Sequence, residues 1–162
     1  MDTRIDWTDL KIMAELQRDG RLTNVELARR VNLSPTPCIE RVRRLERDGF
    51  IKGYAAELDA ARLDAGLRVF VEVSIDRTTK EAFEQFAAKV KKLPEVTECY
   101  MVAGGFDYLL QARVRDMAAY RDFLGRALLE VASIRETRSY LVMEEVKSER
   151  AIPLPAKARE RG

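Results

Sequence analysis

The spacing of the apolar residues changes at about residue 60, and this change limits the chain to an α+β fold. Before it, apolar residues recur every three or four positions, as Leu10, Met13 and Leu16 do, which is the period of an amphipathic helix. After it, they occupy every second position of residues 67–75, which is the period of a β-strand. The sequence therefore predicts a helical first part and a mixed second part.

The first part predicts three short helices with recognisable ends. The first covers about residues 6–18 and ends at the pair Asp-Gly that follows. Thr23 and Glu26 match a capping box, in which Thr23 caps the second helix and the Glu26 side chain binds back to the Thr23 backbone. Ser34 caps the third helix, about 35–48, whose first turn tolerates two prolines. Two helices joined by so short a turn are typical of a helix-turn-helix.

The second part predicts the order β-α-β-β-α-β, which is the ferredoxin-like pattern. Each helix carries a single apolar stripe, so both helices should cover the same face of a four-stranded sheet. The other face keeps apolar residues such as Phe70 and Leu109, which predicts that a second copy of the chain packs on it. The expected elements are a strand at 67–75, a helix at 83–93, strands at 96–103 and 107–115, a helix at 120–131 and a strand at 134–146.

The composition excludes several classes of protein. The chain has 29 basic and 27 acidic residues, and the whole excess lies in residues 148–162, so nucleic-acid binding must rest on how the charges are arranged. It has no His, which removes the usual general base and the commonest metal ligand, and Cys38 and Cys99 fit no zinc pattern. No apolar stretch reaches membrane-helix length, and the start lacks a signal-peptide core. We expect a cytoplasmic protein without cofactor, metal or membrane partner.

The third helix carries an asymmetric set of side chains. On a helical wheel, Cys38, Val42 and Leu45 fall on one side, which predicts that they face the core and that Cys38 is a small buried apolar residue. The opposite side gathers polar and basic residues, with Arg41 at its edge: Thr36, Glu40, Arg43, Arg44 and Arg47. The sequence thus predicts a helix with an arginine-rich exposed side.

In a DNA-binding helix-turn-helix, the second helix of the pair enters the major groove. Hydroxyls at the helix N-terminus suit phosphate contact, and the arginines suit phosphate or guanine. For Glu40, a bond to a cytosine amino group is open, but pairing with an arginine one turn away is favoured. The alternative is a solvated face on a structural helix. The predicted DNA-contacting residues are Ser34, Thr36, Pro37, Glu40, Arg41, Arg43, Arg44 and Arg47.

Residues 102–108 place two glycines and a carboxylate between two predicted strands. Gly104 and Gly105 allow backbone N–H groups to approach a ligand carboxylate, and Asp107 suits an ammonium group. Together they suit a zwitterionic amino acid. The alternative is an ordinary glycine-rich hairpin loop, and the turn by itself favours this alternative.

Three runs, in this order, resemble the Lrp/AsnC family of bacterial and archaeal regulators: LSPTPCIERVRRLERDGFI at 33–51, GGFDYLL at 104–110 and VMEEVK at 142–147. The resemblance extends over residues 5–147. It implies a winged or wing-like helix-turn-helix domain at 1–52, a hinge strand and linker at 53–66, a RAM/ACT-like effector domain at 67–147 and a tail at 148–162. It also implies homodimers, formed through the sheets, that assemble into octamers.

Within this family, effector amino acids bind between dimers, near the glycine turn and the last strand. The resemblance therefore implies as effector-binding residues Met101, Gly104, Gly105, Asp107, Thr137 and Ser139. It also implies an effector such as leucine or another small or branched amino acid.

These observations predict a bacterial, nucleoid-associated transcription regulator that binds double-stranded DNA and responds to an amino acid. The first alternative is an architectural DNA-binding protein without an effector. The second is a small enzyme on a ferredoxin-like scaffold, which the sequence disfavours because it shows no nucleophile paired with a base.

Overall fold

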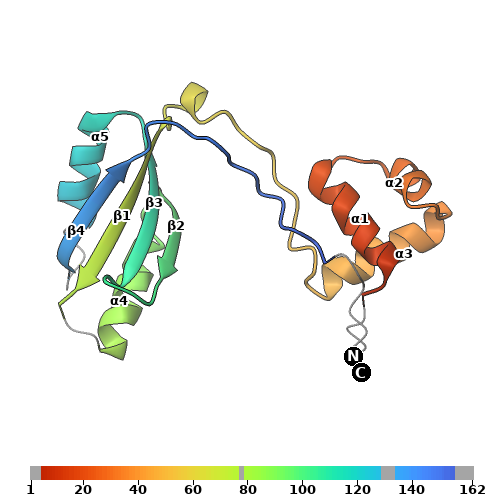
Figure 1. The fold of residues 1–162 in the computed structure, drawn as a ribbon, viewed down its shortest axis with the longest axis horizontal. Coiled ribbons are helices and arrows are strands. Elements are labelled where there is room, and N and C mark those ends of the chain that lie inside the picture. Colours follow the sequence, from red (N-terminus) through yellow and green to blue (C-terminus); the bar gives the residue numbers. More distant parts are fainter. Residues whose placement is uncertain (1–4, 77–78, 129–133, 156–162) are drawn as a thin grey trace. The chain divides into compact units, whose positions relative to one another are not determined.

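The computed structural model describes residues 5–76, 79–128 and 134–155. The chain divides into two compact units, of which unit 1 comprises residues 1–57 with 147–162 and unit 2 comprises residues 58–146 (Figure 1). The C-terminal segment that we expected to be a separate tail thus groups with the N-terminal helices. The elements of unit 1 are α1 (Trp7–Arg18), α2 (Asn24–Arg30) and α3 (Pro35–Arg47), and those of unit 2 are η1 (Ala61–Leu63), β1 (Leu67–Ile75), α4 (Lys80–Val90), β2 (Val96–Met101), β3 (Tyr108–Val114), α5 (Met117–Asp122), η2 (Phe123–Leu128) and β4 (Ile134–Leu141).

Unit 1 is a three-helix domain around a small apolar core, as predicted. Ile12, Leu27, Cys38 and Leu45 are all buried in this core, which confirms that Cys38 is a buried apolar residue. The turn between α2 and α3 passes through Asn32, whose φ of 57° is a left-handed conformation that Asn tolerates better than most residues. These features form the compact helix-turn-helix that the sequence indicates.

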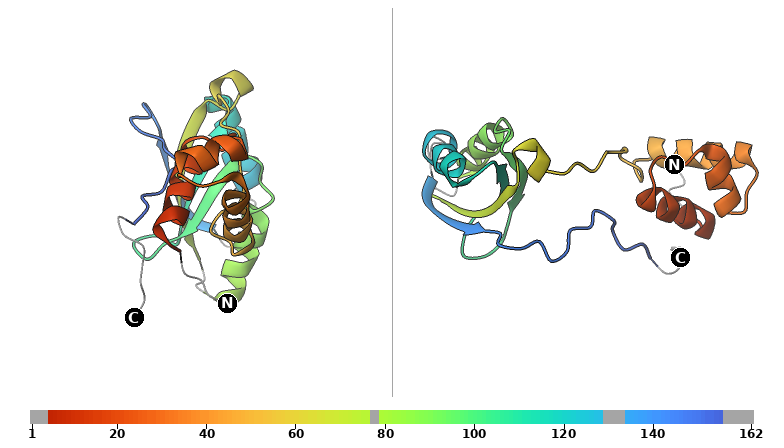
Figure 2. Two further views of the ribbon diagram at one scale, coloured as in Figure 1. Left: turned by 90° about the vertical axis from the view of Figure 1, so that its right-hand side faces the viewer. Right: turned by 90° about the horizontal axis from the view of Figure 1, so that it is seen from above.

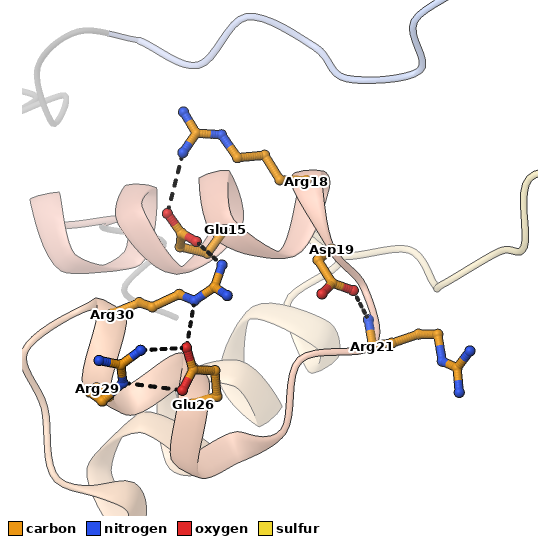
Figure 3. Close-up of polar contacts among 7 residues, drawn as sticks. All are labelled: Glu15, Arg18, Asp19, Arg21, Glu26, Arg29 and Arg30. Atoms are coloured by element: carbon orange, nitrogen blue, oxygen red, sulfur yellow. Dashed lines mark hydrogen bonds and ion pairs between the residues drawn. The ribbon is translucent and has the colours of Figure 1, made fainter.

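Charged contacts join α1 and α2, and they correct one prediction (Figure 3). Thr23 caps α2 as expected, because its hydroxyl accepts a bond from the Glu26 N–H at 3.2 Å. The Glu26 carboxylate, however, is bound by Arg29 at 2.8 Å and Arg30 at 3.0 Å, so the capping box is only half formed. Arg30 also reaches Glu15 of α1 at 3.0 Å. The Glu26 carboxylate binds the two arginines because hydrogen bonds between two charged groups are stronger than a bond to a backbone N–H.

The segment after α3 differs from the expected hinge strand. No strand is assigned to residues 53–66 in the described chain, since a strand needs a hydrogen-bonded neighbour and none lies beside this segment. Tyr54 instead anchors its start on unit 1, because its hydroxyl donates to Glu46 at 2.9 Å and its ring lies against Gly20. Burial and the bond to Glu46 raise the pKa of Tyr54 to about 12. In the described chain the predicted hinge strand is therefore not formed, and the regular element that residues 53–66 contain is η1.

Unit 2 has the predicted ferredoxin-like architecture. Its antiparallel sheet has the order β2-β3-β1-β4, and α4 and α5 cover one face, as both figures show (Figures 1 and 2). Val69, Val71 and Val73 of β1 pack on that face against Phe86 and Phe123 of the helical layer. The alternation of apolar residues in β1 therefore produces the core.

In unit 2, the last strand and the second helix do not end as predicted. The last strand stops at Leu141 instead of continuing to 146, and after the Val142 N–H bonds to the Arg68 carbonyl at 3.0 Å the chain leaves the sheet. Glu145 then pairs with Arg68 at 2.8 Å. The second helix continues past α5 as the π-helical segment η2, and the part of the prediction beyond residue 128 lies outside the described residues.

The uncovered face of the sheet mixes aromatic and charged residues. Phe70 of β1 stands opposite Gln111 of β3 and Tyr140 of β4. Glu72, two positions along, stands opposite Leu109 and Arg138. Residues directly opposite one another share a face, so these side chains form two cross-strand rows away from the helices.

Candidate nucleic-acid interface and effector site

The N-terminus of α3 offers few groups for a phosphate, and in the described part of the chain no side-chain hydrogen bond occupies the hydroxyls of Ser34 or Thr36. Ser34 occupies the N-cap position, and its hydroxyl makes no capping bond. Pro35 and Pro37 have no N–H, and the Cys38 N–H bonds to the Ser34 carbonyl at 3.3 Å. What remains for an anion is the Thr36 N–H and the two hydroxyls of Ser34 and Thr36, fewer donors than a helix N-terminus normally provides.

One line of exposed side chains runs along α3. Thr36, Glu40, Arg43 and Arg47 are spaced by four, three and four positions, so they lie on one face of the helix, and all four are exposed. Arg47 pairs weakly with Asp48 at 3.4 Å, and Arg43 forms no ion pair with any residue in the described ranges. We call these four residues the exposed stripe of α3. It provides two arginines that can reach a ligand without breaking a strong bond.

Arg41 and Arg44 point instead to α1, which corrects the helical-wheel prediction for Arg44. The Asp9 carboxylate is completely buried and accepts from Arg41 at 2.9 Å and from Arg44 at 2.5 Å. Arg41 also binds Asp6 at 2.6 Å. A buried carboxylate is stable only when it is paired and hydrogen-bonded, so these arginines turn inward to neutralise it. They hold α3 against α1.

Asp6 and Asp9 also form the capping box of α1. The Asp9 N–H donates to Asp6 at 2.8 Å, and the Asp6 N–H donates to Asp9 at 3.0 Å. Partial burial raises the pKa of Asp6, but the bonds from the Asp9 N–H and Arg41 outweigh it and hold that pKa below 3.8. The sequence signal for this role is the Asp-x-x-Asp spacing before an apolar stripe.

Glu40 does not pair with Arg43 or Arg44 in the described part of the chain, contrary to expectation; Arg44 is bound to Asp9 instead. Its carboxylate stays on the exposed stripe. It also borders an open groove of about 390 Å³ beside α3, together with Asp6, Pro37, Arg41 and Arg44. The groove is lined by charges of both signs. The negative charge of Glu40 on the exposed stripe repels phosphates, so this surface should bind fewer DNA sequences than a purely basic one.

In unit 2, the carboxylate of Asp107 has a structural role. It accepts a bond from the Ile75 N–H at 2.7 Å, and the Asp107 N–H donates to the Val73 carbonyl at 3.0 Å. Gly104 and Gly105 are exposed, and no atom lies within 4 Å of a Cβ built on either. The turn is therefore tied to β1 at Asp107 and open at its glycines.

A hollow of about 60 Å³ lies beside Gly105 on the uncovered face of the sheet. One wall carries charges of both signs, because Arg138 binds Glu136, two positions earlier on β4, at 3.0 Å. The remaining residues around it are Glu72, Ser74 and Phe106. Its walls therefore carry charges of both signs.

The other expected effector residues lie on β2 and β4, the two edge strands of the sheet. Thr137 stands opposite Val73, Val73 opposite Tyr108, and Tyr108 opposite Met101, so Thr137 and Met101 lie at opposite edges of the sheet. This row is on the helix side, because Val73 and Tyr108 are core residues. Ser139 shares that side, and its hydroxyl bonds to the Tyr120 hydroxyl. Met101 therefore adjoins the glycine turn at the end of β2, whereas Thr137 and Ser139 lie on β4 and away from that turn.

Comparison with known proteins decides how these two units are interpreted. Residues 5–52, which contain α1 to α3, match the model of a winged helix-turn-helix DNA-binding domain. Residues 68–152 match the Lrp/AsnC ligand-binding domain. The chain belongs to the Lrp/AsnC family. The ligand-binding match runs past β4 to residue 152, which includes part of the segment that we expected to be a tail.

Members of the Lrp/AsnC family resemble this chain over most of its length. The leucine-responsive regulatory protein of Salmonella typhimurium is 58% identical over 143 residues, covering 88% of this chain and 87% of that protein. That of Escherichia coli K12 is 57% identical over the same length. The chain is thus an effector-responsive transcription regulator with a DNA-binding and an amino-acid-binding domain.

Solved structures of the Lrp/AsnC family agree with the fold. A transcriptional regulator from Neisseria meningitidis, determined as a complex with L-Met, is 45% identical with a TM-score of 0.88, covering 92% of this chain and 96% of that one. An AsnC family regulator from Agrobacterium tumefaciens is 36% identical with the same TM-score, covering 92% and 97%. In the residues that the structure describes, no helix is long and apolar enough to cross a membrane, and no cluster of side chains suits a metal ion.

Proposed function

We propose that this Lrp/AsnC regulator reads double-stranded DNA through the exposed stripe of α3. The supporting observation is the division of the α3 arginines, in which Arg41 and Arg44 brace the helix and Arg43 and Arg47 stay available. In this arrangement Arg43 and Arg47 bind phosphates or guanine edges, and Ser34 and Thr36 hold a phosphate at the helix N-terminus. Arg41 and Arg44 act as positioning residues.

Salt-dependent DNA binding tests this division. The probe is a DNA site that the protein selects from a random library. Arg43→Ala and Arg47→Ala should weaken binding at least fivefold, and each lost phosphate contact should lower the slope of log affinity against log salt by about 0.9. Arg121→Ala, which removes one positive charge from an exposed position of unit 2, is the control. If all three variants bind within twofold of one another, the stripe is not the reading surface.

We further propose that the effector is leucine, another branched-chain residue or a similar small apolar amino acid such as methionine. The names of the relatives support leucine, and the Neisseria meningitidis complex contains methionine. A thermal-shift screen of the twenty amino acids tests this, because a ligand at 100 times its Kd stabilises the folded state by about 2.7 kcal/mol. A midpoint that rises with apolar amino acids only is expected. A flat screen would favour the effector-independent architectural protein.

The placement of the effector residues leads us to propose that the complete site needs more than one chain. Met101, Gly104, Gly105 and Asp107 lie together around the turn after β2, while Thr137 and Ser139 lie on β4 at the other edge of the same sheet. Contacts between copies would bring these positions together, and the hinge segment 53–66 would find its strand partner in the same way. We propose a homodimer that assembles into a homo-octamer.

The uncovered sheet face is the proposed dimer contact, and sedimentation tests it. Tyr140 is 49% exposed on this face, and Met117 is 47% exposed on the helical layer of the same unit. Tyr140→Glu should give smaller species than the wild type, because it buries a charge in the contact, whereas Met117→Glu should not. Equal sizes for both variants would place the contact elsewhere.

We propose no catalytic role, since the named relatives are transcription regulators. A regulator of this kind acts on chromosomal DNA, which supports a cytoplasmic, nucleoid-associated location. Incubation with each amino acid, followed by analysis of the mixture, tests the first point. An amino acid that is consumed over time would make the protein an enzyme.

A further inference from the structure

A glutamine of α1 holds the C-terminal segment on unit 1. The Ile152 N–H donates to Gln17 Oε1 at 2.8 Å, and Gln17 Nε2 donates to the Ile152 carbonyl at 3.2 Å. The side-chain amide thereby satisfies both backbone groups of one residue, as a neighbouring strand would. Two positions later, Leu154 is half-buried against the core of unit 1. Two different kinds of contact thus fix residues 151–155 in one register.

The two prolines of this segment restrict its backbone to the extended conformation in which it docks. Ile152 and Leu154, which make the contacts, each precede a proline. A residue before proline is restricted to extended conformations, and proline itself has a fixed φ. The segment therefore loses less conformational entropy on docking than an ordinary chain end would. The prolines also bring no N–H that would need a partner.

We propose that the face of α1 around Gln17 is a docking surface for residues 151–155 of the same chain, and that this contact connects the effector unit to the DNA-binding unit at a second point. β4 ends at Leu141, eleven positions before Ile152. Those eleven positions span at most about 40 Å. While residues 151–155 are docked, the end of β4 therefore stays within this distance of α1 along the chain.

The contact reaches the DNA-reading helix through α1 itself. Gln17 and Asp9 lie on the same helix, about 12 Å apart along its axis. Asp9 binds Arg44 of α3, so the docked segment, α1 and the exposed stripe of α3 form a continuous series of contacts. This role rests on the proposed function, because it makes the docked segment one route by which an effector changes DNA affinity.

Hydrogen exchange at the Ile152 amide tests the docking without DNA or an effector. Gln17→Ala, which removes both bonds, and Leu154→Ser, which removes the apolar contact, should each speed exchange there at least tenfold. Gln85→Ala, at an exposed position of α4, is the matched control and should change nothing. A chain ending at Pro155 should keep full protection. Unchanged exchange in Gln17→Ala would overturn the docking, and protection lost on dilution would show docking on a second copy instead and overturn it as well.

DNA affinity measured with and without L-leucine or L-methionine tests the connection. A chain ending at Ser148 should bind DNA within threefold of the wild type when no amino acid is added, whereas its response to the amino acid should fall at least threefold. A full response in that variant would overturn the proposed connection. A wild-type protein with no response to any amino acid would overturn the proposed function and this route with it, while the exchange measurement would still decide the docking.

Discussion

The buried carboxylate of Asp9 provides the sharpest test of how the DNA-binding unit is held together. Asp9→Asn keeps the size of the side chain but removes its charge and replaces one acceptor oxygen by a donor amide. Arg44, whose only ion pair in the described residues is with Asp9, then loses it. The Asp6 N–H, which donates to Asp9, is also affected. The substitution therefore breaks the joint between α1 and α3 without leaving a cavity.

The expected loss of unfolding free energy in Asp9→Asn follows from the burial of the Asp9 carboxylate and its two arginine partners. Removing one partner of a buried ion pair costs about 3–5 kcal/mol. Arg41 retains its bond to Asp6 at 2.6 Å, and the side chains of both arginines remain about a third exposed, so water relieves part of the loss. We expect about 3 kcal/mol of lost unfolding free energy. With a urea m-value of about 1–2 kcal/mol per molar, the midpoint should fall by about 2 M.

Tryptophan fluorescence measures this loss in unit 1 alone. Trp7 is the single tryptophan of the chain and lies in the first turn of α1. Asp19→Asn is the matched control, since the Asp19 side chain is exposed and, among the described residues, accepts a bond only from the Arg21 N–H, at 2.9 Å. This variant should stay within about 0.5 kcal/mol of the wild type. If Asp9→Asn also stays within this range, the buried pair does not hold α3, and our account of Arg41 and Arg44 is wrong.

Three further predictions concern other parts of the chain. Bonds from Arg29 and Arg30 lower the pKa of Glu26 from 4.5 to about 2, so the stabilising effect of this carboxylate is complete above about pH 4.5 and is lost as the pH falls through 2. The urea midpoints of the wild type and Glu26→Gln should therefore differ most at neutral pH and converge between pH 4.5 and 2. A difference that stays constant with pH would contradict this account of Glu26. Phe86→Ala, in the core of unit 2, should cost about 3–5 kcal/mol in a circular-dichroism melt and leave the Trp7 transition unchanged. Gly49 has φ 77° and open space where a Cβ would lie, so Gly49→Ala should cost about 1–2 kcal/mol and Gly49→Asn clearly less, as urea midpoints would show.

The parts of the fold that the sequence predicts are those that local signals determine. The positions of α1 and α3 follow from apolar stripes and from the glycines that end them. The alternation in β1 predicts a strand because its inward side chains fill the core whichever strands lie beside it. The order of the elements in unit 2 then leaves the ferredoxin-like arrangement as the natural solution.

The features that the sequence did not predict are those in which one side chain has several possible binding partners. Arg44 lies one turn from Glu40, and a local rule favours that pair, but the buried carboxylate of Asp9 on another helix is the stronger competitor. Glu26 leaves the capping box for two arginines for the same kind of reason. The Gln17 bond to Ile152 joins positions 135 apart, and no periodicity in either segment signals it.

This competition explains why net charge is a poor guide to how the protein binds DNA. Asp9→Asn makes the chain more positive by one charge, and a bulk electrostatic account predicts tighter binding to every DNA sequence. If Asp9 instead holds α3 in place, the loss of that joint lets the exposed stripe move relative to the rest of the domain, and binding to the selected site should weaken while binding to random DNA stays the same or increases. Gel shifts on both probes, at a temperature where the variant is folded, separate the two accounts. Tighter binding to both probes would mean that the acidic partners only reduce the charge of this domain and do not position its reading helix.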